Sequence, residues 1–351
     1  MRDDPGTGGP HTLAAALRHW SAGDPGRTAL ADVIAASAEA GAQLAELIAT
    51  SPLDAVRTST GSAAGHRPGA LDVQAEQLFV AAMSGCEVAA VGSQETLAAR
   101  GPAQGGGPVV ALCPIVGSSD VESNAPMGSI FAVLPPAGPL DDPRGALLQP
   151  GRSQLAAGLI VYGPSTTMAL TWGDGTGSYA LDPSSREFVR TRERLELPAD
   201  AQEYSIDASN ARHWGPGITA YVNDLVNGSL GVRERDFTMR WLASLAAEAY
   251  RILLRGGIFL SPADDRPGNR HGHVRLVFEA NPVAFLCEQA GGTATDGVQP
   301  ILDLRPAAPD QRTPLVFGSR NKVDRVRRYL MDPRTTHPES PLFSQRGLFR
   351  S

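Results

Sequence analysis

The stretch DFTMRWLASLAAEAYRILLRGGIFL, residues 236–260, decides the fold class of this chain. Its first part repeats apolar side chains at helical spacing, which predicts a helix over 236–255. The predicted buried face of this helix carries Met239, Leu242, Leu245, Ala249 and Ile252. Gly256-Gly257 then ends the helix, and residues 258–260 begin a strand. A helix that passes through a glycine pair into a strand is typical of α/β proteins.

The same alternation extends over most of the chain. Apolar periodicity predicts helices over 28–48, 72–83 and 283–290, and strands over 109–112, 128–134, 159–162, 166–172, 177–181 and 274–278. The glycine-rich segment 101–108 predicts a loop. We expect a layered α/β protein with two domains, over 12–190 and 191–334, and mobile tails at 1–11 and 335–351.

Composition excludes several classes of protein. A net charge of −6 argues against binding to nucleic acid or to an anionic membrane surface. No apolar run approaches the roughly 18 residues of a membrane span, and the N-terminus does not resemble a secretory signal. The three cysteines form no CxxC pair, which favours the reducing cytoplasm. Lys322 is the one lysine, so the usual point-charge ligand for phosphate is nearly absent from the chain.

Four long strings carry a specific resemblance. They are GSSDVESNAPMGSIFAVLPP (117–136), AAGLIVYGPSTTMAL (156–170), TMRWLASLAAEAYRILLRGGIFLSPA (238–263) and VRLVFEANPVAFLCEQAGGTATDG (274–297). In this order and spacing they resemble the class I fructose-1,6-bisphosphatase family, over about residues 12–330. The resemblance implies the layered α-β-α-β-α sugar-phosphatase fold, a small-molecule substrate and a homodimer or homotetramer.

The family hydrolyses a phosphate monoester with two or three Mg²⁺ ions held by oxygen ligands. Carried over by position, Asp72 matches the acid at a helix start, and Glu279 matches the late metal ligand. Three other ligand positions have changed. The resemblance therefore leaves these vestigial metal positions: Gln94, Glu95, Cys113, Val116 and Glu279. We expect no cofactor, and at most one weakly held divalent cation.

The phosphate-binding positions of the family also depart from its pattern. The matching residues are Asp207, Asn210, Arg240, Trp241, Ser261 and His273, and of these the arginine, which the family supplies from a neighbouring subunit, is unchanged. Gly117, Ser118 and Ser119 match the end of the metal loop and would present backbone donors to an anion. Asp207 would face a phosphate dianion, and like charges in such proximity reduce affinity. A pocket rebuilt for a less anionic ligand is therefore expected.

These departures predict a repurposed small-molecule enzyme of specialised metabolism, diverged from the fructose-bisphosphatases. Asp72, Glu95 and Glu279 would then act as metal-independent acids and bases. Cys113 is either a nucleophile or extra acid, or a side chain that fills apolar space. The carboxylates have a second interpretation as vestigial residues held by hydrogen bonds. Two alternatives for the whole chain stay open: a residual metal-dependent sugar-phosphate phosphatase, and a non-catalytic binding or scaffold protein.

Overall fold

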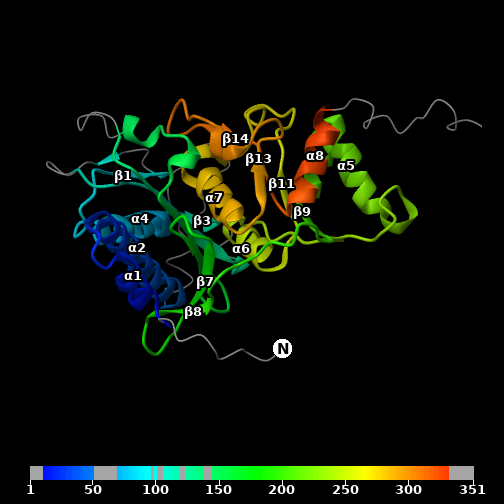
Figure 1. The fold of residues 1–351 in the computed structure, drawn as a ribbon. Coiled ribbons are helices and arrows are strands. Elements are labelled where there is room, and N and C mark those ends of the chain that lie inside the picture. The colour runs from blue at the N-terminus through cyan, green and yellow to red at the C-terminus, as the bar shows by residue number, and fades with distance from the viewer. Residues whose placement is uncertain are drawn as a thin grey trace, which may run out of the picture.

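Five layers of helices and sheets make up the protein, in the order α-β-α-β-α (Figure 1). The structure, a computed structural model, describes residues 11–50, 69–95, 99–100, 106–118, 123–137 and 144–331. Both predicted tails, except His11, and most of the predicted 101–108 loop lie outside the described residues. The layered α-β-α-β-α architecture predicted from the sequence is confirmed. The division near residue 190 stays a prediction.

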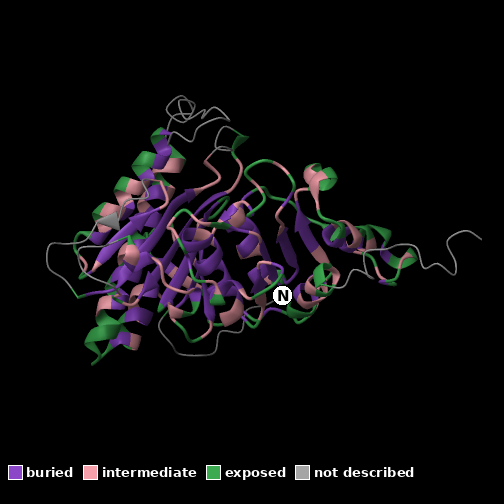
Figure 2. Ribbon diagram, turned by 90° about the horizontal axis from the view of Figure 1, so that it is seen from above, coloured by how far each residue is buried: buried purple, intermediate pink, exposed green. Residues whose placement is uncertain are grey.

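The larger sheet is almost entirely antiparallel and has the strand order β2-β1-β3-β4-β5-β6-β7-β8. Its strands are β1 (Ala90–Ser93), β2 (Ala99–Arg100), β3 (Val109–Val116), β4 (Met127–Leu134), β5 (Ala156–Tyr162), β6 (Thr167–Thr171), β7 (Thr176–Leu181) and β8 (Phe188–Arg192). The central strands β4 and β5 are buried along their whole length, because helices cover both faces of the sheet (Figure 2). The predicted strands over 109–112, 128–134, 159–162, 166–172 and 177–181 are thus confirmed.

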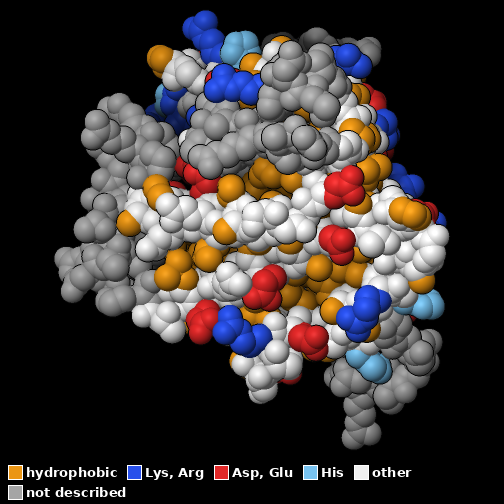
Figure 3. Space-filling model, turned by 90° about the vertical axis from the view of Figure 1, so that its left-hand side faces the viewer, with side chains coloured by type: hydrophobic (Ala, Val, Ile, Leu, Met, Phe, Trp, Pro, Cys, Tyr) orange, Lys and Arg blue, Asp and Glu red, His pale blue; other side chains and the backbone are white. Residues whose placement is uncertain are grey.

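Three helices form the outer layer on this sheet: α1 (Leu13–Ser21), α2 (Pro25–Thr50) and α4 (Ala70–Met83). The last two confirm the helices predicted over 28–48 and 72–83. Their apolar faces pack on β3, β4 and β5. Figure 3 shows the outside of this layer, where hydrophobic side chains gather between isolated acidic and basic ones. No helix among the described residues is long and apolar enough to cross a membrane, and the expected cytoplasmic location stays a prediction.

The middle layer consists of α6 (Leu245–Arg255), α7 (Asn281–Gln289) and a short π-helix, η6 (Leu276–Ala280). Residues 281–287 of α7 are all buried, because β4 to β7 lie on one side of this helix and β13 and β15 on the other. This helix confirms the one predicted over 283–290. The middle layer therefore fills the space between the two sheets (Figure 1).

The smaller sheet has the strand order β10-β9-β11-β15-β13. Its strands are β9 (Glu203–Ile206), β10 (Thr238–Met239), β11 (Ile258–Ser261), β13 (Thr293–Thr295) and β15 (Leu315–Gly318), and a separate pair is formed by β12 (Val274–Arg275) and β14 (Arg312–Thr313). Helices α5 (Pro216–Asn227) and α8 (Arg320–Met331) cover the outer face of the smaller sheet and complete the fifth layer. Short 3₁₀ segments lie at 145–147, 151–153, 208–213, 228–230 and 301–303.

A buried carboxylate joins the middle layer to the smaller sheet. Glu248 of α6 is fully buried and accepts hydrogen bonds from Ser205 Oγ and from the Leu242 backbone N–H, both at 2.7 Å. Its other oxygen accepts from Arg251 Nη2 at 2.9 Å, and Arg251 also pairs with Glu203 of β9 at 2.5 Å. Every oxygen of this carboxylate thus has a donor, which is the condition for burying a charge.

Two predicted elements are wrong in part. The helix predicted over 236–255 begins only at Leu245, because Ser244 is its N-cap and accepts from the Ala247 N–H. Met239 belongs instead to the short strand β10 and Leu242 to the irregular segment after it, and both side chains are exposed rather than on a buried face. The strand predicted over 274–278 ends at Arg275 and continues as η6. The spacing of apolar residues in the sequence does not distinguish a short buried strand from a buried helical turn.

We expect Gly128→Ala to lower the free energy of unfolding by about 1–3 kcal/mol, the usual cost of overpacking. A Cβ atom at Gly128 of β4 would lie 2.4 Å from the Cβ of Ala246 in α6 and 2.5 Å from the carbonyl oxygen of Ile160. Chemical denaturation measures the change. The control is Gly85→Ala, where a Cβ meets nothing within 4 Å. Equal stability of the two variants would show that α6 does not depend on this close approach.

Candidate functional site

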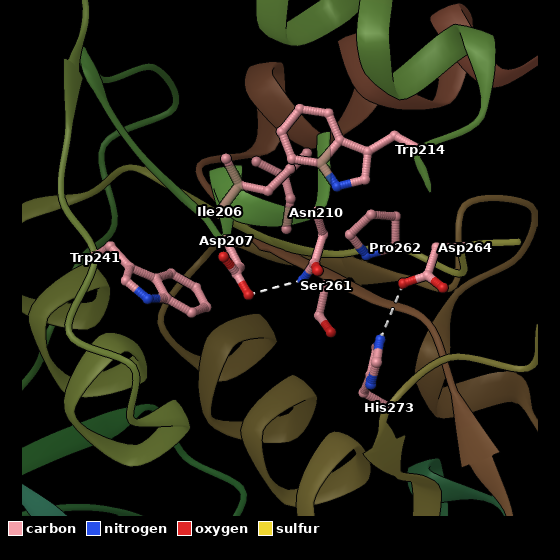
Figure 4. Close-up of a pocket in the computed structure, with 10 residues that line it drawn as sticks. Ile206, Asp207, Asn210, Trp214, Trp241, Ser261, Pro262, Asp264 and His273 are labelled. Carbon is pink, nitrogen blue, oxygen red and sulfur yellow. Dashed lines mark hydrogen bonds and ion pairs between the residues drawn. The ribbon is translucent and has the colours of Figure 1, made fainter. Parts of the chain in front are cut away.

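A cavity of about 190 Å³ lies where β9 and β11 end. These two strands are parallel neighbours, so their carboxyl ends meet at one edge of the smaller sheet, a common place for a ligand site. The cavity is lined by Ile206, Asp207, Asn210, Trp214, Trp241, Leu260, Ser261, Pro262, Asp264 and His273 (Figure 4). Five of the six positions that match the family's phosphate-binding residues are among them. Arg240 is not: its half-exposed side chain lies 3.9 Å from Glu203.

Asp207 and Asn210 hold each other on one side of the cavity. Asp207 caps the short helix that begins at Ala208, and its Oδ1 accepts from the Ser209 N–H at 3.0 Å. Its Oδ2 accepts from Asn210 Nδ2 at 2.7 Å. The Asp207 carboxylate is therefore fixed in place, with an amide group beside it.

A second fixed carboxylate belongs to Asp264, on the opposite side (Figure 4). Arg266 donates to it at 2.6 and 3.0 Å, and His273 Nε2 lies 3.3 Å from Oδ2. The hydrogen bonds from Arg266 hold the pKa of Asp264 well below its usual range. Neither Asp264 nor Arg266 was predicted, because in the sequence they are part of an ordinary polar turn, DDRPGN (264–269).

The aromatic wall of the cavity includes Trp241, predicted to bind substrate, and Trp214, which was not predicted. Trp241 is stacked on Phe259, with ring centroids 6.2 Å apart and planes 9° apart. It nevertheless stays 40% exposed, so one face of the indole is free to meet a ligand. The cavity therefore combines two carboxylates, an amide, a hydroxyl and an imidazole with apolar rings.

The predicted catalytic acids gather at a second place, beside the end of β3. Asp72 lies in the first turn of α4, where its Oδ2 accepts from the Gly69 N–H at 2.6 Å. Glu95 lies in the turn after β1. The Glu279 carboxylate, in η6, accepts from the Arg275 N–H at 2.7 Å. These three residues and Cys113 are close enough to act on each other's charge, as their predicted convergence requires.

Burial raises the pKa of two acids in this cluster, Glu95 and Glu279. Burial, with the charge of Asp72 next in importance, raises the pKa of Glu95 to about 7. Burial also raises the pKa of Glu279, although the hydrogen bond from the Arg275 N–H opposes the change. Glu95 therefore gains and loses its proton near neutral pH, which is the property of a general acid or base.

Cys113 and Val116 lie on β3, at a bulge in its pairing with β4. The Cys113 side chain is fully buried, and its Sγ lies 3.8 Å from the Ile115 carbonyl oxygen. Burial, followed by the charges of Glu279 and Glu95, raises the pKa of this thiol well above its usual range. The thiol is therefore protonated at neutral pH, which favours packing over a role as nucleophile. Val116 packs against the apolar core between the sheets.

Gly117 follows β3 with φ +86°, a conformation that favours glycine. Ser118 beside it is half-buried, and Ser119 lies outside the described residues. The predicted role of these three residues in binding an anion stays a prediction.

Arg275 and Gln94 lie beside the predicted acids, and the role of Arg275 was not predicted. We call this group the acid cluster: Asp72, Glu95, Glu279, Cys113, Arg275 and Gln94. Arg275 Nη1 donates to the Gln94 carbonyl oxygen at 2.8 Å, which brings its guanidinium beside the acids. Gln94 Oε1 is buried and has no hydrogen-bond partner among the described residues. The described ranges contain no group of three or more His, Cys, Asp or Glu side chains that could hold a metal ion. The sequence alone gave no reason to single out Arg275. Its importance becomes clear only from the structure, where η6 brings the Glu279 carboxylate to the Arg275 backbone N–H.

The cavity and the acid cluster are joined by one segment, 273–279. His273 lines the cavity, whereas Arg275 and Glu279 belong to the acid cluster. A ligand with two functional ends would therefore meet both groups along a single stretch of backbone.

Comparison with known proteins gives a consistent result. Family models described as "Fructose-1-6-bisphosphatase, N-terminal domain" and "Fructose-1-6-bisphosphatase, C-terminal domain" match residues 28–193 and 197–331. The chain is 44% identical to "Fructose-1,6-bisphosphatase class 1" of Azorhizobium caulinodans, over 91% of this chain and 98% of that protein. It is 48% identical to the protein of the same name from Sinorhizobium medicae, over 80% and 81%. The crystal structure of Leishmania major fructose-1,6-bisphosphatase in holo form superposes with a TM-score of 0.83 at 27% identity, covering 91% of this chain and 98% of that one.

These similarities overturn one expectation from the sequence. The prediction of a repurposed enzyme of specialised metabolism, or of a non-catalytic scaffold, is wrong, because relatives 40–48% identical over most of the chain carry the name fructose-1,6-bisphosphatase class 1. The prediction was wrong because it gave a few changed side chains at the ligand positions more weight than the similarity of the whole chain to the family.

We expect Glu95→Gln to stabilise the protein above pH 7. The folded-state pKa of about 7 lies above the unfolded value of about 4.5, so the folded protein binds this proton more tightly. Stability therefore falls as pH rises from about 4.5 through 7, and the amide removes that loss. The gain should be about 1 kcal/mol at pH 8, because solvent screens part of the charge on a half-buried side chain.

Thermal unfolding between pH 4 and 8 measures this effect. Glu187→Gln, an exposed carboxylate, is the control and should follow the wild type throughout. A Glu95→Gln variant that unfolds with the wild-type pH dependence would contradict the assignment of a raised pKa to Glu95.

Proposed function

Because the chain belongs to the class 1 fructose-1,6-bisphosphatase family, we propose that it hydrolyses a phosphate monoester of a sugar, with fructose 1,6-bisphosphate as the first substrate to test. The identity to proteins of that name over nearly the whole chain carries this proposal. The segment 273–279 supports it, because a sugar with two phosphates needs a site at each end. We propose a homodimer or homotetramer, in which the exposed Arg240 serves a neighbouring subunit.

The metal ions of the family do not fit the donors of this chain. Cys113 is a buried, protonated thiol, and Val116 has no donor atom. Glu279 accepts a hydrogen bond from the Arg275 backbone N–H at one oxygen, which leaves its other oxygen for at most a single cation. Mg²⁺ requires near-octahedral oxygen ligands and keeps several of its waters, so the described donors do not build a two-ion cluster.

The residues of the acid cluster have separate roles in the proposed hydrolysis. Glu95, as the carboxylate, takes a proton from the attacking water as its oxygen bonds to phosphorus. The phosphorus–oxygen ester bond breaks, and the sugar oxygen receives a proton from solvent. The Arg275 guanidinium stabilises the negative charge on the phosphoryl oxygens. Burial, followed by the charge of Asp72, raises the pKa of Glu95 to about 7 and so keeps it protonatable near neutral pH.

We expect phosphate release from fructose 1,6-bisphosphate above the rate of a protein-free blank. Glu95→Gln should lower kcat by about 10²–10⁴-fold, the size of a general acid or base effect, and Asp72→Asn and Glu279→Gln should lower it too. Each amide keeps the shape of its acid while removing the titration. Release of inorganic phosphate in single-substrate assays measures both effects.

The matched control is Cys113→Ser, which should keep most of the activity because the thiol is buried and protonated. Absence of phosphate release from the wild type, with and without added Mg²⁺ or Mn²⁺, would contradict the proposed function. Full activity in all three amide variants would instead show that this cluster is not the active site.

Crystals soaked in Mn²⁺ test the metal separately. We expect at most one ion near Glu95 and Glu279, because neither Cys113 nor Val116 supplies an oxygen ligand. Anomalous scattering locates the ion. Two ions about 3.5–4 Å apart beside Glu279 would show that the donor set has been misjudged.

A further inference from the structure

Lys322 is the one lysine of the chain, and it is buried. It lies in the first turn of α8 with a relative exposure of 1%, and its Nζ has no hydrogen-bond partner among the described residues. The amine lies 4.4 Å from the centre of the Phe237 ring, so it faces an aromatic ring. Lysine is almost never fully buried without a partner, so this position requires an explanation.

Two other donors near Lys322 also lack partners. Arg233 is 8% exposed, and its Cζ lies 4.8 Å from the centre of the same Phe237 ring. The Nη1 of Arg233 is buried and, within the described part of the chain, unpaired. Tyr221 of α5 lies beside it, with Cζ of Arg233 6.0 Å from the tyrosine ring, and the Tyr221 hydroxyl is likewise buried and unpaired. We call Lys322, Arg233 and Tyr221 the donor cluster.

The charge around the donor cluster is strongly positive. Arg235 and Arg325 add two cations, and Asp200 is the acid that acts on Lys322 from nearby. The Asp200 carboxylate forms an ion pair with Arg235, whose Nη2 donates to it at 2.5 Å. Burial, followed by the charge of Arg233, lowers the pKa of Lys322 to about 7. Asp224 accepts from the Tyr329 hydroxyl, a neutral donor that cancels no charge, so this carboxylate offsets part of the positive excess.

We propose that the donor cluster binds a small oxyanion of the phosphate or sulfate type. An ammonium, a guanidinium and a phenol supply donors and no carboxylate, and a guanidinium matches the oxygens of a tetrahedral anion. The anion would receive the unpaired hydrogen bonds and balance the charge. It would reach the cluster past Arg235 and Asp200, whose side chains are 36% and 33% exposed.

This oxyanion site is separate from the candidate active site. It lies between α5, α8 and the segment 228–237, in the outermost layer (Figure 1), and none of its residues lines the cavity at Asp207. A variant that loses sulfate binding at this site therefore says nothing about the proposed hydrolysis, which the phosphate-release assay tests separately.

Thermal unfolding in sodium sulfate, against sodium chloride at matched ionic strength, tests the proposal. For the wild type we expect sulfate to raise Tm by about 2 °C more than chloride, because the anion binds the folded state. Lys322→Met should lose this difference, since methionine keeps the buried volume without a charge. The control Arg328→Met removes a cation from the exposed side of the same helix and should keep the difference.

A second readout follows from the uniqueness of Lys322. Protein labelled with ¹⁵N-lysine gives one side-chain amine signal, which should shift with sulfate and not with chloride. The pKa read from that signal should rise when sulfate binds, because an anion favours the charged amine. A signal that sulfate leaves unchanged, or a sulfate effect on Tm that is equal in Lys322→Met and Arg328→Met, would mean that the cluster holds only water, and would overturn the proposal.

Discussion

The buried carboxylate of Glu248 is the interaction on which the candidate active site depends most directly. It lies on α6 and receives hydrogen bonds from β9 and from the segment before the helix. Asp207 follows β9, and Trp241 belongs to that segment, so the Asp207 side of the cavity and its Trp241 wall are held by one buried carboxylate. Loss of a partner from a buried ion pair typically costs 3–5 kcal/mol, far more than a surface pair. The geometry of the cavity therefore depends on Glu248 and its hydrogen-bond donors Ser205 and Leu242, none of which lines the cavity.

Local patterns predicted the regular elements well, because their periodicity reflects burial. The strands from β3 to β7 and the helices α2, α4 and α7 all follow apolar patterns whose faces are covered in the fold. The pattern before Ser244 misled, since Met239 and Leu242 repeat like a buried face yet stay exposed. The capping serine was the better signal there. Strand β12 and η6 were confused because both are short and buried.

The candidate site was predicted where the resemblance supplied positions, as with Asp207, Ser261 and His273. Arg275, Asp264 and Arg266 were missed, because their importance arises from contacts made only in the fold: Arg275 reaches Gln94, 181 positions away. The expectation of a repurposed protein failed for a related reason. Side-chain changes at a few ligand positions describe local chemistry, whereas identity along the whole chain reports the family.

The complete burial of α7 has a consequence for folding. Its residues contact β4 to β7 on one side and β13 and β15 on the other, and Thr176 of β7 donates to the Leu286 carbonyl oxygen. Neither sheet can lose this helix without exposing its own apolar face to water. Unfolding that begins in either half must therefore spread to the other, which makes the two halves one cooperative unit. A chain cut between residues 193 and 197 would leave the first half with a large uncovered sheet, prone to associate with other molecules rather than to fold alone.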